Sequence, residues 1–101
     1  MRDLELALLL AQAADEVSLS RFQALDLKVE TKPDRTPVTD ADQAVETRIR
    51  ELIAQHAPGD AVIGEEFEDT GSGSRQWVID PIDGTANYLR GLPIWGSLIA
   101  L

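Results

Sequence analysis

The chain has 101 residues, which gives room for one domain with a single modest core. Hydrophobic residues make up 44% of the sequence and charged residues 27%, a composition that excludes an intrinsically disordered chain. The formal net charge of -9 argues against nucleic acid and anionic membranes as partners, because both attract basic surfaces. There is no cysteine, so disulfides and thiolate metal sites are excluded.

A long helix is the first predicted element, over residues 4–25, where strong helix formers dominate. Its apolar stripe, which we expect to be substantially covered, comprises Leu6, Leu9, Leu10, Ala13 and Val17 with Leu4, Leu8 and Ala11 beside it. The segment would also suit a secretory signal, but the acids Asp3 and Glu5 stand where such a signal needs positive charge. It is too short for a membrane span, which takes about 20 apolar residues. We therefore expect a cytoplasmic protein with no membrane partner.

Alternating apolar and polar residues over 27–31 predict a half-buried strand, and two prolines make the segment 32–37 a loop. Thr39 and Asp40 then offer N-cap groups for a second helix. Apolar side chains at positions 45, 49, 52 and 53 recur at helical spacing. This second helix is predicted to be amphipathic and to end near His56.

Three short apolar runs follow, and each predicts a strand. The first covers residues 61–64, and a Gly/Ser-rich turn at 71–74 connects it to the second at 77–79. The third covers 94–101, and we expect it to be cut short by the end of the chain.

Acidic residues follow the first two of these strands. Asp80 and Asp83 stand at the end of an apolar run, where two carboxylates are costly unless a cation or a basic group neutralises them. Pro81 would direct both side chains and the Ile82 carbonyl toward one point. Oxygen ligands of this kind suit magnesium. For such an Asp pair read alone, a solvated turn is the alternative.

A phosphate site is predicted beside this acidic pair. Gly84 and Thr85 can begin a helix whose free N–H groups would bind phosphate, and the Thr85 hydroxyl can orient an attacking water. Glu65, at the end of the neighbouring strand, would bind a first metal and draw a proton from that water. Glu65 and its neighbour Glu66 read alone indicate an exposed acidic turn instead.

The two acidic segments occur in the order that is typical of one enzyme family. Gly64-Glu65-Glu66 and the later run 77–87, Trp-Val-Ile-Asp-Pro-Ile-Asp-Gly-Thr-Ala-Asn, resemble the paired signatures of the inositol monophosphatase family. The resemblance implies an α/β fold, the layered αβαβα sandwich of sugar phosphatases. Residues 1–101 would be the N-terminal part of one such phosphatase domain, with the C-terminal half missing.

The same resemblance implies magnesium-dependent hydrolysis of a small-molecule phosphate monoester by a homodimer, with two or three magnesium ions bound. Glu65, Asp80 and the Ile82 carbonyl would hold the first ion, and Asp80 with Asp83 the second. The segment 38–42 is similar to the family's upstream loop and helix start, where Asp42 would bind a further, weaker ion through water. For Asp42 read alone, a helix-capping acid is an equal alternative.

The resemblance also implies the catalytic and substrate-binding residues. Thr85 with Glu65 would activate the attacking water, and Asp83 with the backbone amides of Gly84 and Thr85 would bind the phosphate. The loop that contains Lys32 is expected to close over the site. A further metal-binding Asp is expected from the missing half, so the activity of these 101 residues alone is left open.

Within the family, residues 25–27 and 31–42 are most similar to histidinol-phosphatases of the actinobacterial type. This implies L-histidinol phosphate as the substrate and a role in histidine biosynthesis. An inositol-1-phosphate phosphatase or a broad-specificity sugar or nucleotide phosphatase is the alternative, because substrate-selecting residues of the family lie largely in the missing half. An inactive metal-binding fragment or an interaction module is the alternative from another class.

Overall fold

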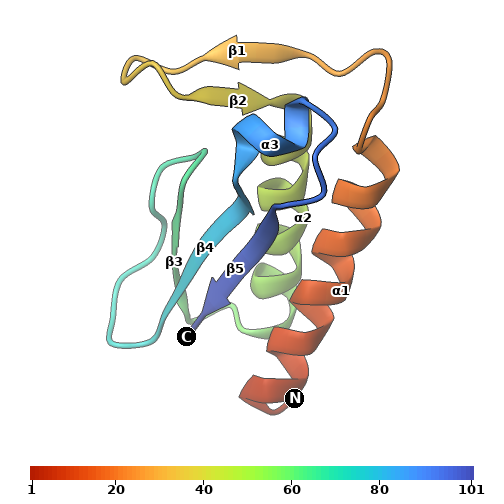
Figure 1. Cartoon of the computed structure of the whole chain (residues 1–101). Coiled ribbons are helices and arrows are strands. Elements are labelled where there is room, and N and C mark those ends of the chain that lie inside the picture. Colours follow the sequence, from red (N-terminus) through yellow and green to blue (C-terminus); the bar gives the residue numbers. More distant parts are fainter.

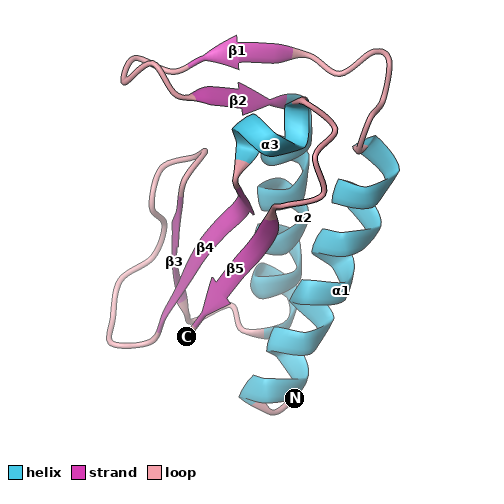
Figure 2. Cartoon of the chain, viewed as in Figure 1, coloured by secondary structure: helices cyan, strands magenta, loops and turns pink.

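The computed structural model describes all 101 residues of the chain. In chain order the elements are α1 (Asp3–Arg21), β1 (Val29–Thr31), β2 (Pro37–Thr39), α2 (Asp40–His56), β3 (Ala61–Gly64), β4 (Gln76–Asp83), α3 (Thr85–Leu89) and β5 (Gly96–Ala100) (Figure 1). Strands β1 and β2 form a hairpin, and the other three form a sheet in the order β3-β4-β5. Helices α1 and α2 lie side by side against this sheet (Figure 2).

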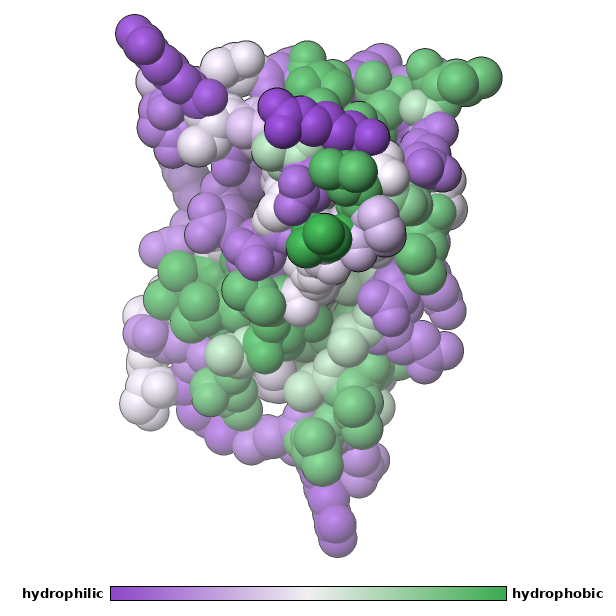
Figure 3. Space-filling model, in the orientation of Figure 1, coloured by the Kyte–Doolittle hydropathy of each residue, from purple (hydrophilic) through white to green (hydrophobic).

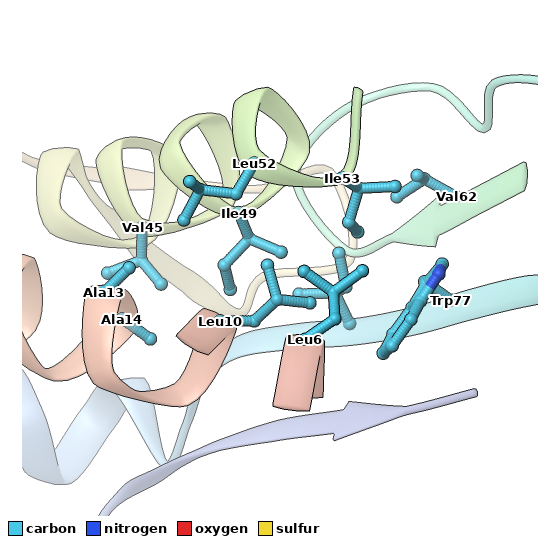
Figure 4. Packing of buried hydrophobic residues seen from close by; sticks show 11 residues of the cluster. Leu6, Leu10, Ala13, Ala14, Val45, Ile49, Leu52, Ile53, Val62 and Trp77 are labelled. Carbon is cyan, nitrogen blue, oxygen red and sulfur yellow. The ribbon is translucent and has the colours of Figure 1, made fainter. Parts of the chain in front are cut away.

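The main core lies between these two helices and the three-stranded sheet. Leu10 of α1, Ile49 and Ile53 of α2 and Trp77 of β4 meet there, and each is at most 1% exposed (Figure 4). Burying an aliphatic side chain of this size stabilises the fold by about 1.5–3 kcal/mol. The Trp77 indole N–H donates to Asp60 Oδ2 at 2.9 Å, so its one polar atom is satisfied.

Helix α2 begins and ends where the sequence predicts. Thr39 is its N-cap residue, and the backbone N–H of Asp42 donates to Thr39 Oγ1 at 3.3 Å. In return the Thr39 backbone N–H donates to Asp42 Oδ2 at 2.8 Å, which completes a capping box. The buried apolar side chains recur at helical spacing, so the helix lays one face against α1 and β4.

The sheet brings the carboxyl ends of two strands to one edge. β3 and β4 run parallel, with Val62 opposite Trp77, and β5 runs antiparallel to β4, with Ile79 opposite Ile99. The crossover from β3 to β4 contains no helix and carries Thr70 back beside Val62. Residues that follow β3 and those that end β4 therefore lie close together.

The first helix differs from the sequence prediction in length and coverage. It ends at Arg21, not near residue 25, because Gln23 takes a positive φ of 61° that a right-handed helix cannot include. The expected covering of the apolar stripe is confirmed for Leu6, Leu10 and Ala13. It is wrong for Leu4 and Leu8, which are 70% and 62% exposed.

The hairpin also differs from the prediction. Strand β1 lies where a strand is expected, but its three residues are exposed and not half-buried, because the hairpin packs against α2 and α3 through β2. Residues 37–39, of which Pro37 was assigned to a loop, form the partner strand β2, with Thr31 opposite Pro37. Proline is tolerated there because it is the first residue of a strand with one partner.

Apolar side chains also remain on the surface. No helix combines the length and the apolar character needed to cross a bilayer. Over β4 and β5 the surface carries apolar groups (Figure 3), with Val78 49% and Leu98 54% exposed.

Candidate metal and phosphate site

A cavity of about 280 Å³ opens at the edge where β3 and β4 end. Its wall is formed by the β1–β2 loop, the acids after β3, the end of β4 and the start of α3. The lining residues are Lys32, Thr36, Pro37, Glu65, Glu66, Asp80, Ile82, Asp83, Gly84, Thr85 and Ala86. The structure thus brings together every predicted site residue except Asp42, which lies behind this wall and reaches it through Thr85.

A β-bulge turns both aspartates of β4 toward the cavity. Side chains three positions apart in a regular strand point to opposite faces of the sheet. Asp80 lies opposite Leu98 and Asp83 opposite Gly96, so three steps along β4 match two along β5. The extra residue in β4 therefore brings the carboxylates of Asp80 and Asp83 to the same face of the sheet. Pro81 lies within the bulge, where its missing N–H disturbs no regular ladder, and its carbonyl accepts from Ser97 Oγ at 2.7 Å.

Negative charge accumulates in the cavity. Burial, which is the largest cause, and the neighbouring carboxylates Glu65 and Asp83 together raise the pKa of Asp80 to about 6. Such a shift means that the ionised form of Asp80 is disfavoured in this environment. A cation placed among these groups would remove that penalty, and no basic side chain of the chain is hydrogen-bonded to Asp80.

Thr85 connects the cavity to helix α2. Its hydroxyl lies 2.9 Å from Asp42 Oδ1 and 3.0 Å from the Ile82 carbonyl, and its single proton can be donated to either acceptor. Asp42 is 1% exposed, and its other oxygen accepts from Thr39. The helix-capping role considered for Asp42 is therefore present, while metal binding by Asp42 through water stays a prediction.

Gly84 turns the chain sharply from β4 into α3. Its φ of 90° is unfavourable for other residues, and an added Cβ would lie 3.0 Å from the Ile94 carbonyl oxygen. The same carbonyl accepts from Asn87 Nδ2 at 2.9 Å, which ties α3 to the chain before β5. Because α3 spans only Thr85–Leu89, its dipole is small, and phosphate binding by the amides of Gly84 and Thr85 stays a prediction.

The donor groups suit a hard cation such as magnesium. Glu65, Asp80 and Asp83 offer carboxylate oxygens and Ile82 a carbonyl oxygen, which is an all-oxygen set. In the conformation shown, no three acidic or histidine side chains converge closely enough to hold an ion by themselves. The chemistry of these residues therefore fits a magnesium ion, and the binding of the ion by them stays a prediction.

Two further acids at the cavity, Glu66 in its wall and the buried Glu46, have no role predicted from the sequence. Glu66, whose side chain is 4% exposed, accepts from Lys32 Nζ at 2.9 Å. Burial raises the pKa of Glu66, and the lysine opposes this effect. Lys32 thus lines the cavity, and closure of its loop over the site stays a prediction. Glu46 of α2 is fully buried under the Glu65–Glu66 segment, and its position on the apolar face of α2, one turn after Asp42, is the signal that could have revealed it.

The sequence profile of the inositol monophosphatase family matches residues 2–101. The chain belongs to this family. It is 61% identical over 99 residues to the histidinol-phosphatase of Streptomyces coelicolor. The aligned residues make up 98% of the chain and 37% of that relative. It is 59% identical over 100 residues to the histidinol-phosphatase of Mycobacterium tuberculosis. This second alignment includes 98% of the chain and 38% of that relative.

A solved structure supports the same assignment for this inositol monophosphatase family member. The extragenic suppressor protein suhB of Bartonella henselae superposes with a TM-score of 0.89 at 27% identity, over 96% of the chain and 39% of that structure. The predicted α/β fold class and the family resemblance are confirmed. The chain spans less than two fifths of the length of each of these three relatives.

Proposed function

We propose that the chain is the N-terminal part of a magnesium-dependent phosphatase that hydrolyses L-histidinol phosphate to L-histidinol and phosphate. The observation that carries the proposal is the cavity in which Glu65, Asp80, Asp83 and Thr85 meet, in a family member that is 59–61% identical to two histidinol-phosphatases. A cytoplasmic location and a place in histidine biosynthesis are part of the same proposal.

The proposed metal ligands are the cavity's oxygen donors. Glu65, Asp80 and the Ile82 carbonyl would hold one ion, and Asp80 with Asp83 a second. A third, weaker ion near Asp42 is also proposed. When bound, the ions would offset the charge of the phosphate group and of the transition state. The raised pKa of Asp80 supports this assignment, because it marks a carboxylate that lacks a cationic partner.

The chain's own residues would orient water and phosphate. Because the Thr85 hydroxyl donates its proton into the protein, its lone pairs are free to accept a hydrogen bond from a water in the cavity. Glu65 would take the proton that this water loses as its oxygen attacks phosphorus. The ester P–O bond breaks, and the departing oxygen takes a proton from solvent to leave as the alcohol. Asp83 and the amides of Gly84 and Thr85 would hold the phosphate for this attack.

The remaining part of the active site is proposed to come from residues beyond these 101. The relatives are much longer, and the carboxylates here do not converge closely enough to hold an ion alone. A further acidic ligand and the substrate-selecting wall would be supplied by the additional chain. A homodimer is proposed for the complete protein.

An inactive metal-binding chain is the second candidate for the 101 residues alone. The missing convergence of three acidic side chains favours its inactivity, because the 101 residues alone would hold an ion only loosely. This candidate concerns the 101 residues alone and is compatible with the first, because in both the full-length gene product would hydrolyse phosphate esters.

Phosphate release tests both candidates. We would assay L-histidinol phosphate and inositol 1-phosphate, with and without magnesium, using the 101-residue chain and the full-length gene product. Magnesium-dependent release from histidinol phosphate by the full-length protein is expected. Faster release from inositol 1-phosphate would contradict the assignment of L-histidinol phosphate as the substrate. Absence of magnesium-dependent release from both esters would contradict the phosphatase proposal.

A further inference from the structure

Glu46 lies beneath the segment that carries Glu65. Its side chain is 0% exposed, and its carboxylate faces the turn after β3. Glu46 Oε1 accepts from the backbone N–H of Glu66 at 2.9 Å, and Oε2 accepts from the backbone N–H of Phe67 at 3.1 Å. A buried ionised carboxylate is costly unless several donors satisfy it, and two backbone donors are supplied by this one turn.

Gly64, the residue before Glu65, lies close against the carboxylate of Glu46. A Cβ atom added to Gly64 would overlap the Glu46 carboxylate, so only glycine allows this close approach. Glu46 therefore contacts the backbone on both sides of Glu65 while leaving the Glu65 side chain exposed toward the cavity.

Arg50, one turn further along α2, secures this arrangement. Its Nε donates to Glu46 Oε2 at 2.9 Å, and Arg50 is itself largely covered, with 16% of its side chain exposed. The other guanidinium nitrogens donate at 3.3 Å to the Phe67 carbonyl and to Thr70 Oγ1. The ion pair thus fixes the conformation of Glu46 and of the turn at the same time.

Helix α2 consequently supports both acidic segments of the cavity. Asp42 contacts Thr85, at the start of α3, and Glu46, four residues later on the same face, contacts the turn that carries Glu65. A single rigid helix therefore sets the positions of two chain segments that meet at the cavity.

We propose that Glu46 is a positioning residue that holds Glu65 in the candidate metal site through the backbone of residues 64–67, without touching the ion. The inference rests on the proposed magnesium-dependent function. Partners that orient metal ligands are worth about ten- to a hundredfold in metal affinity when they are removed. A buried ion pair with a purely structural role would change stability and leave the affinity for magnesium unchanged.

The test measures magnesium binding by calorimetry in the full-length gene product, at a temperature where circular dichroism shows each variant to be folded. Glu46→Asp keeps the charge but shortens the side chain, so its carboxylate no longer reaches both amides. Gly64→Ala displaces the same carboxylate from the opposite side. Both variants are expected to raise the dissociation constant for magnesium about ten- to a hundredfold. Hydrogen exchange at the amides of Glu66 and Phe67 should accelerate in Glu46→Asp.

Two control variants separate positioning from charge and from stability. Glu51→Gln removes a negative charge from an exposed position of the same helix, and Ile49→Val removes a methyl group from the core. Both should bind magnesium as the wild type does. Unchanged magnesium affinity in Glu46→Asp and Gly64→Ala would overturn the positioning role and leave the proposed function standing. Absence of magnesium binding in the wild type would overturn the proposed function and this inference together.

Discussion

Asp60 shows how a single carboxylate near the start of β3 depends on its partners. The indole N–H of Trp77 and the guanidinium of Arg75, 3.0 Å away, hold the pKa of Asp60 below its ordinary value of 3.8. A carboxylate with a lowered folded-state pKa stabilises the protein above that ordinary value, and the contribution is lost as the pH falls through the lower folded-state pKa.

We therefore expect Asp60→Asn to be less stable than the wild type near pH 7, with a difference that shrinks below about pH 4. Urea unfolding followed by tryptophan fluorescence at several pH values would measure this difference. A difference that stays constant down to pH 2 would show that the ionised carboxylate of Asp60 is not the source of the effect.

The side chains that meet in the cavity could be predicted from the sequence, whereas the roles assigned to them stay predictions. Glu65, Asp80 and Asp83 stand out because each follows an apolar run, where a carboxylate needs a partner. Glu46 does not stand out in this way, because its partners are backbone amides contributed by a turn twenty or more positions away. Such partners exist only once the chain is folded.

At the scale of elements, the capping box of α2 positions Asp42 as well as starting a helix. Thr39→Ala removes the hydroxyl that donates to Asp42 at 2.6 Å and accepts from its backbone N–H. We expect a loss of about 1–2 kcal/mol in the free energy of unfolding, measured by urea denaturation. Thr47→Ala, at an exposed position of the same helix, is the matched control and should change stability by less than about 0.5 kcal/mol. Equal effects of the two substitutions would contradict the capping role.

The elements with strong local signals were predicted well and those set by tertiary contacts were not. Helix α2 has both an N-cap signal and a clear apolar period, and its bounds are confirmed. Strand β2 has three residues and begins with Pro37, so it is too short to show the alternation of apolar and polar residues that would predict its pairing with β1. The bulge in β4 was also missed, because it depends on how β5 pairs with Asp80 and Asp83.

At the scale of the whole molecule, one side of the three-stranded sheet is open. Val78 and Leu98 are exposed there. Helices α1 and α2 cover the other side (Figure 1). If the complete protein is longer, like its relatives, the additional chain can form a further layer on this face, and such a layer would bury these side chains.

Val78→Asp tests this arrangement. In the 101-residue chain the substitution should change the free energy of unfolding by less than about 1 kcal/mol, because the side chain is half exposed. In the full-length gene product a buried, unpaired carboxylate should cost about 3 kcal/mol or more. Equal, small effects in both proteins, measured by chemical denaturation, would show that nothing packs on this side of the sheet.

The acidic cavity is proposed to be a metal-dependent phosphatase site, and Asp83→Asn in the full-length gene product tests this proposal. Phosphate release from L-histidinol phosphate would be measured across a magnesium titration, with circular dichroism as the control for folding. Asp83 is exposed at the end of β4, so its replacement should leave the fold intact. We expect turnover to fall at least about a hundredfold, because a proposed ligand of the second ion is lost. Turnover at the wild-type rate in the folded variant would contradict the claim.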